Sequence, residues 1–135
     1  MILTIHHDDT LEHVQRIFNS EFPFLKLEFF SRPHDRGKPS ERQFLINSRS
    51  TVQSCNPQIT ERTLSIPTAM TVQELEQTFQ QQLGLNVQVF RKSGRVWLET
   101  TATDNWSLFK QNMEGQELSS AKAEAEDFPD YHEQP

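Results

Sequence analysis

The N-terminal segment contains the residues whose types and spacing come closest to a chemical site. His6, His7, Asp8 and Asp9 are consecutive, and His13 follows four residues later. Imidazole and carboxylate groups are ligands of zinc and of other divalent metals. Successive strand residues point to opposite faces, so only alternate members of the run could share one ion. His13, on the first turn of a helix, could add a third ligand, so a metal-binding or hydrolytic domain is our alternative hypothesis.

Nucleophilic chemistry finds less support. The single cysteine, Cys55, excludes an internal disulfide and any site with several thiolate ligands. Neither Cys55 nor Ser93 lies in a local motif that would fix a histidine and an acid beside it. The chain also has no glycine-rich phosphate loop. We therefore expect a protein that is not an enzyme and that holds no cofactor.

A stretch of mixed charge lies in the middle of the chain. Residues 31–42, "SRPHDRGKPSER", contain two prolines and one glycine, which predicts a loop. We interpret it as solvated, although it could bind an anion or phosphate, or pair with the acidic C-terminus. Its basic side chains are Arg32, His34, Arg36, Lys38 and Arg42.

Length and charge limit the possible functions. A chain of 135 residues fits one domain, which we place at 1–115. The net charge of −6 comes from the C-terminus, where residues 111–135 contain one lysine and seven acidic residues. We therefore expect an acidic flexible tail at 116–135. The neutral body makes nucleic acid and anionic membranes poor partners, and the absence of a signal peptide or long apolar run predicts a cytoplasmic protein.

The chain contains two similar segments, offset by 61 residues. Residues 3–22 align with 64–83, and each reads as a short strand, a threonine start signal and an amphipathic helix. Thr71 with Glu74 has the spacing of a capping box, and Gly84 is a helix stop. In the first copy, Asp9 or Thr10 can cap the helix and Pro23 ends it.

A second strand follows each helix. Residues 25–30 and 86–91 alternate apolar and polar side chains, and the match between them needs one inserted residue. We predict an α+β fold of duplicated β-α-β units with a C-terminal hairpin strand. Its helices would pack on one face of a mixed sheet with parallel strands, as in a ferredoxin-like two-layer sandwich. The connection 31–62 would be partly ordered, with a short strand or helical turn at Phe44–Ile46.

A short C-terminal helix is expected after the hairpin. Asp104 can cap it and Gly115 can end it. Trp106, Phe109 and Met113 recur at spacings of three and four, so they share one face of this helix.

The segment 89–100, "VFRKSGRVWLET", predicts a hairpin with an aromatic pair. A turn at Ser93-Gly94 would place Phe90 opposite Trp97, on the face away from the helices. In a two-layer domain this face of the sheet is exposed to solvent, and an exposed apolar patch such as this aromatic pair usually marks a contact surface. Three things could cover the aromatic pair: the C-terminal helix, a second copy of the chain, or a ligand.

Our main hypothesis is a non-enzymatic protein-interaction module that acts through this aromatic sheet face. Its partner would be another protein or itself, as a homodimer. Single-stranded nucleic acid, stacked on the aromatic rings, is a second alternative. The predicted binding surface comprises Phe90, Trp97, Phe30, Phe24, Lys92 and Arg95.

Overall fold

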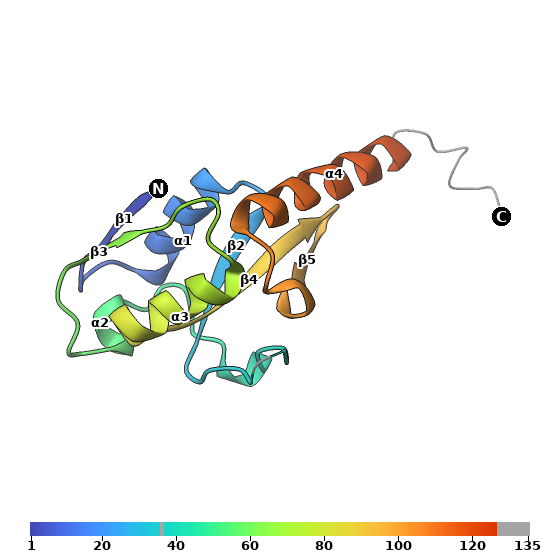
Figure 1. Ribbon diagram of the computed structural model, residues 1–135. Helices are drawn as coiled ribbons and strands as arrows, with labels where there is room; N and C mark the ends of the chain where they lie inside the picture. The colour runs from blue at the N-terminus through green and yellow to red at the C-terminus, as the bar shows by residue number, and fades with distance from the viewer. Residues whose placement is uncertain (36, 127–135) are drawn as a thin grey trace.

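The computed structural model describes residues 1–35 and 37–126, with only the main chain described for 121–126 (Figure 1). The strands are β1 (Ile2–Ile5), β2 (Leu25–Phe30), β3 (Arg62–Ser65), β4 (Asn86–Ser93) and β5 (Val96–Glu99). The α-helices are α1 (Leu11–Glu21), α2 (Val52–Cys55), α3 (Val72–Leu83) and α4 (Leu108–Glu126), and the 3-10 turns are η1 (Arg42–Phe44) and η2 (Thr101–Thr103).

The strands form two antiparallel sheets, so the α+β class is confirmed but the mixed sheet is wrong. β1 pairs with β3, and β2, β4 and β5 lie in the order β2-β4-β5. Each strand pairs with its counterpart from the other strand–helix–strand unit, rather than with the strand of its own unit. The helix of each unit therefore carries the chain from one sheet to the other instead of joining parallel neighbours.

The two strand pairings are centred on matched residues. Leu3 lies opposite Leu64, and these residues are 61 positions apart, the offset of the sequence alignment. Leu27 lies opposite Val89, which matches it once the inserted residue is counted. In both pairings, the residues that the alignment matches therefore lie opposite each other. Whether the sequence arose by duplication stays a prediction.

The starts of the helices also pair in a matching way in the two units. α1 begins beside α2, and α3 begins beside α4, each through a reciprocal pair of main-chain hydrogen bonds. Short bridges at the cap residues, Thr10 to Thr51 and Thr71 to Ser107, accompany them. The bonds run from Leu11 N to Ser50 O (2.9 Å), Val52 N to Asp9 O (2.8 Å), Val72 N to Trp106 O (3.1 Å) and Leu108 N to Met70 O (2.8 Å).

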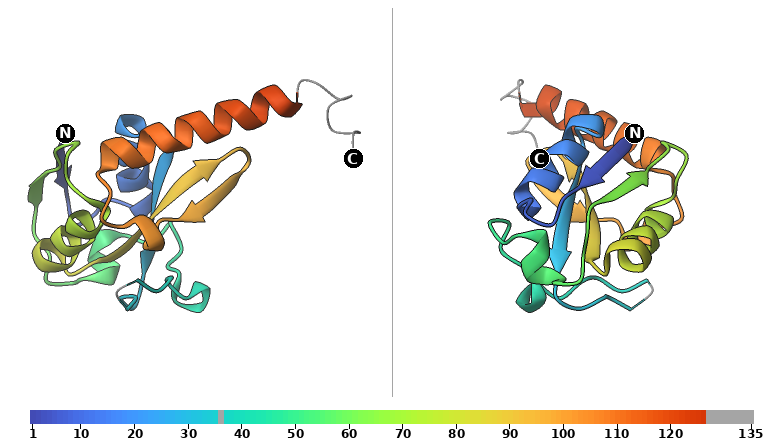
Figure 2. Two further views of the ribbon diagram at one scale, coloured as in Figure 1. Left: turned by 45° about the vertical axis from the view of Figure 1, so that its right-hand side comes forward. Right: turned by 90° about the vertical axis from the view of Figure 1, so that its left-hand side faces the viewer.

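The core lies between the two sheets. Figure 2 (right) shows β1 and β3 in front of β2 and β4, with α1 and α3 on opposite sides. Leu3, Leu64, Leu27 and Val89 belong to one buried cluster with the apolar faces of both helices. The Phe29 and Phe79 rings meet edge to face, with centroids 6.1 Å apart, which joins β2 to α3.

The predicted signals of α1 and α3 are confirmed. The side chain of Thr71 accepts from Glu74 N while Glu74 accepts from Thr71 N, so the capping box is complete. Gly84 ends α3 in the left-handed conformation, with φ of 65°. Thr10, rather than Asp9, caps α1 by accepting from His13 N.

The C-terminal helix is longer than predicted. α4 starts at Leu108, where Ser107 Oγ accepts from Lys110 N at 3.1 Å, so the expected cap at Asp104 is wrong. The helix continues past Gly115 to Glu126, so the expected stop at Gly115 is wrong as well. Gly115 is buried instead, and a Cβ there would lie 2.8 Å from Phe24 Cβ. The glycine thus permits close packing rather than a left-handed turn. Part of the predicted tail is helical, and its residues 127–135 lie outside the described residues.

The connection 31–62 contains the elements η1 and α2. A main-chain hydrogen bond attaches it to β2, from Ile46 N to Phe29 O at 2.8 Å, and beside it Ser31 N donates to Phe44 O within the connection, also at 2.8 Å. The expected strand or turn at Phe44–Ile46 is a 3-10 turn followed by a single bridge from Leu45 to Phe30. Arg36 lies outside the described residues.

Candidate interaction surface

One face of the β2-β4-β5 sheet turns away from the core. We call it the open sheet face, and its side chains alternate along each strand with those that point inward. Segment 40–46 covers its end near β2, where Ser40 Oγ donates to Oε1 of the fully buried Gln88 at 3.2 Å. The open sheet face comprises Lys26, Glu28, Phe30, Gln88, Phe90, Lys92, Trp97 and Glu99.

The hairpin register differs from the prediction by two residues. Phe90 lies opposite Glu99, and Trp97 lies opposite Lys92. The loop is Gly94-Arg95 rather than Ser93-Gly94, because glycine takes the first loop position with φ of 66°. A shift of two residues keeps the side-chain faces, so Phe90 and Trp97 still share the open sheet face.

A lysine lies over both rings of the aromatic pair. Lys26 Nζ is 5.5 Å from the centroid of Phe90 and 5.0 Å from that of Trp97. It also forms an ion pair with Glu28 at 3.4 Å. Phe90 and Trp97 are half-buried, and they line a hollow of about 450 Å³. Its other lining residues are Lys26, Glu28, Phe30, Arg42, Leu45 and Glu99.

The C-terminal helix does not cover this pair. α4 packs on the opposite face of β4, where Arg91 Nη1 donates to Gln111 Oε1 at 2.8 Å. The Trp106 ring lies 5.8 Å from the Arg91 guanidinium, on that same side. Phe109 of α4 is 57% exposed and Met113 is 39% exposed. The explanation that the helix folds over the aromatic pair is therefore wrong for the described residues.

The other predicted surface residues do not all reach the hollow. Phe30 lines it but is only 5% exposed, and it forms a bridge with Leu45. Phe24 packs against α4 at Gly115, and its main-chain N–H donates to Asn112 Oδ1 at 2.9 Å. Lys92 lies opposite Trp97, and Arg95 is exposed in the turn. The structure thus brings together Phe90, Trp97 and Phe30, and separates Phe24 from them.

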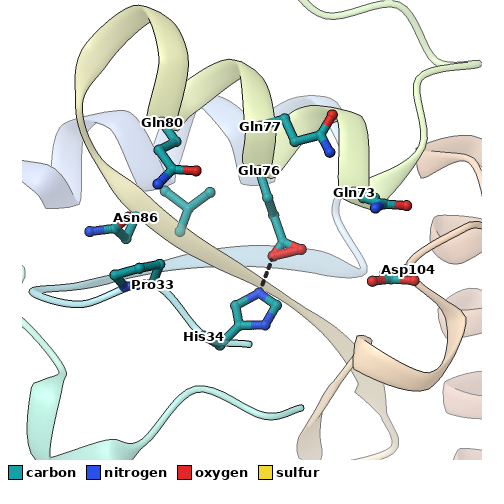
Figure 3. A pocket seen from close by; sticks show the side chains of 9 residues that line it. Pro33, His34, Gln73, Glu76, Gln77, Gln80, Asn86 and Asp104 are labelled. Carbon is teal, nitrogen blue, oxygen red and sulfur yellow. Dashed lines mark hydrogen bonds and ion pairs between the residues drawn. The ribbon is translucent and has the colours of Figure 1, made fainter. Parts of the chain in front are cut away.

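A second, polar pocket of about 330 Å³ lies beside α3 (Figure 3). His34 Nε2 donates to Glu76 Oε2 at 2.8 Å, and Nδ1 donates to Asp35 O at 3.0 Å. Since both partners are acceptors, both ring nitrogens carry a proton and His34 is an imidazolium ion. The remaining lining residues are Pro33, Gln73, Gln77, Gln80, Asn86, Val87 and Asp104.

The charges of this pocket are coupled. The hydrogen-bonded Glu76 carboxylate raises the pKa of His34 to about 9, although burial opposes the shift. Burial raises the pKa of Glu76, the bond to His34 lowers it, and the negative charge of Asp104 raises it further. Burial also raises the pKa of Glu99, against the effect of His34. The pair fastens the connection 31–44 to α3.

Sequence reasoning missed this pair because it treated the loop as solvated. His34 and Glu76 are 42 residues apart, and nothing local marks either as a partner. The only available signal was the alignment of the two units, in which Glu76 matches Gln15. Gln15 donates to Leu27 O at 2.8 Å on the outer edge of β2, so both positions lie beside a sheet.

The histidine and aspartate cluster stays on the surface. His6 N donates to Asp9 Oδ2 at 2.8 Å, which closes the turn before α1. His6 Nδ1 lies 3.6 Å from Glu61, with both side chains exposed. His7, Asp8 and His13 are exposed as well. Nowhere in the described part of the chain do three or more His, Cys, Asp or Glu side chains form a group that could hold a metal ion.

Comparison of the chain with protein-family models, curated proteins and solved structures found no match. Within residues 1–35 and 37–126, no helix combines the length and the apolar composition needed to cross a membrane.

Proposed function

We propose that this chain is a non-enzymatic protein-interaction module that acts through the open sheet face and self-associates. The observation that carries the proposal is the hollow at Phe90 and Trp97, where two large rings lie half-buried beside Lys26. Aromatic side chains are enriched in the centres of protein interfaces, because they combine a large apolar area with few rotatable bonds. The rim is polar and carries both signs of charge, at Lys26, Glu28 and Glu99, as interface rims commonly do.

The proposal favours a homodimer or a contact with another protein over nucleic acid. The hollow contains carboxylates as well as Lys26 and Arg42, so it offers no uniform positive field for a phosphate backbone. A single cysteine, Cys55, fits a reducing compartment, and we place the module in the cytoplasm.

Substitution of the aromatic pair tests the proposal. The double variant Phe90→Ala, Trp97→Ala should weaken self-association, measured as molar mass by light scattering at several protein concentrations. The wild-type dimer would have twice the monomer mass of 15.8 kDa. Phe109→Ala is the matched control, because this exposed ring lies on α4, on the other side of the sheet. If the double variant unfolds, the pair belongs to the core and the proposal fails.

A further inference from the structure

We propose that two copies of this chain associate by antiparallel pairing of their β5 strands, about a two-fold axis that passes between the two Trp97 residues. This inference rests on the proposed function, because it identifies the partner as a second copy and gives the register of the contact. The pairing would join the two β2-β4-β5 sheets into one continuous sheet, with both open sheet faces on the same side.

The first argument is the direction of the main-chain groups of β5. β5 is the last strand in the sheet order. Thr100 N donates to Val89 O at 3.3 Å, so the alternation of an antiparallel ladder turns the N–H and C=O of Trp97 and Glu99 away from β4. In the described part of the chain, neither residue makes a main-chain hydrogen bond on that side. Such an edge is a template for another strand.

The second argument is the apolar character of this edge. Val96 is 52% exposed and Leu98 is 43% exposed, and both lie on the face opposite Trp97. Figure 2 (left) shows the β4–β5 hairpin projecting from the body beneath α4. The exposed residues of β3 are polar instead: Arg62, Thr63 and Ser65.

The outer edge of β2 is already occupied. Gln15 Nε2 donates to Leu27 O and Asn19 Nδ2 donates to Leu25 O, each at 2.8 Å. Ile46 N donates to Phe29 O farther along the same edge. Of the two edges of this sheet, β5 is therefore the one that can accept a second copy.

The third argument fixes the register. The segment 95–99, "RVWLE", is complementary to itself when two copies run antiparallel. With Trp97 opposite the partner's Trp97, Val96 meets the partner's Leu98, and Arg95 meets the partner's Glu99. A register centred on Arg95 or on Glu99 would place like charges opposite each other, which destabilises strand pairs. The charged and the apolar residues are therefore both matched in this register.

Charge reversal in separate chains tests this register. Arg95→Glu places two carboxylates opposite each other at both ends of the pair, and Glu99→Arg places two guanidinium groups there. Each variant alone should dimerise on the order of tenfold more weakly than the wild type. An equimolar mixture should recover dimers, because only the mixed pair has opposite charges at both ends. Light scattering of the three samples, with circular dichroism to confirm folding, measures the effect.

A second substitution tests the edge without changing the charge pair. Leu98→Lys should weaken dimerisation, whereas Ile2→Lys should not, since Ile2 is an exposed apolar residue of β1 in the other sheet. If all these β5 variants associate like the wild type but Phe90→Ala, Trp97→Ala does not, the β5 pairing is overturned and the proposed function stands. A wild-type chain that stays monomeric at every concentration overturns both.

Discussion

Leu27 of β2 lies directly opposite Val89 of β4, and the two residues hold the same position in their strand–helix–strand units. Leu3 of β1 lies opposite Leu64 of β3 in the same way. The two strand–helix–strand units therefore meet at their strands in the core, but their outer edges differ. The first unit covers the outer edge of β2 with side-chain amides, whereas the second unit adds β5. The candidate interface lies on β5, the strand that only the second unit has.

The close packing of α4 predicts that Gly115→Ala destabilises the fold. Alanine favours a helix by about 1 kcal/mol over glycine, so an exposed site would gain stability. At Gly115 the new methyl group would meet Phe24 Cβ at 2.8 Å and Lys92 O at 3.2 Å. We expect a net loss of roughly 1–3 kcal/mol, typical of overpacking, in urea denaturation. The exposed neighbour Gln116→Ala is the control and should change the stability by less than about 0.5 kcal/mol.

The two threonine caps predict unequal costs for the same substitution. Thr71→Ala removes the bond that Glu74 N donates and the bond from Thr71 Oγ1 to Glu74 Oε1 at 2.9 Å. Thr10→Ala removes the single bond that His13 N donates at 3.2 Å. We expect Thr71→Ala to lower the free energy of unfolding by about 1–2 kcal/mol. Thr10→Ala should lower it by less, about 0.5–1 kcal/mol. Equal losses in thermal or urea unfolding would contradict a role for the second bond at Thr71.

The His34–Glu76 pair predicts a stability that depends on pH. The pKa of His34 is raised from 6.5 to about 9 in the folded chain, so the folded state binds the proton more tightly than the unfolded state. The stabilisation is complete below 6.5 and disappears as the pH rises through 9. His34→Gln should therefore lose roughly 1.5–3 kcal/mol at about pH 6 and little at about pH 10.

A matched variant separates this pair from general effects of pH. His7→Gln removes an exposed imidazole on the loop before α1 and should show no such window. The measurement is the free energy of unfolding in urea at several pH values. A constant difference between wild type and His34→Gln across that range would show that the ion pair does not contribute.

The two tryptophans predict different responses to association. Trp97 lies on the open sheet face, whereas Trp106 lies near Arg91 and Lys110 on the other side of the sheet. In a Trp106→Phe chain, quenching of Trp97 fluorescence by acrylamide should decrease as the protein concentration rises. In a Trp97→Phe chain, quenching of Trp106 should stay constant. The reverse pattern would place the interface on the side of α4.

The sequence predicted the features that depend on local patterns. The capping box at Thr71, the stop at Gly84 and the shared face of Phe90 and Trp97 all follow from the spacing of neighbouring residues. The pairing of β1 with β3 could not be predicted in this way, because alternation shows which face is buried but not which strand lies alongside. The role of Gly115 was also missed, since a glycine that permits close packing looks the same in sequence as a helix stop.

The bonds that Gln15, Asn19 and Ile46 make along β2 have a consequence for assembly. Strand pairing often continues without limit, because a sheet that gains a strand at one edge still offers the other. Here the outward carbonyl groups of Leu25, Leu27 and Phe29 already accept hydrogen bonds, so we expect this sheet to grow at β5. When two such edges meet, neither copy has an edge of this sheet left to offer. Association would then stop at two copies instead of continuing into a fibre.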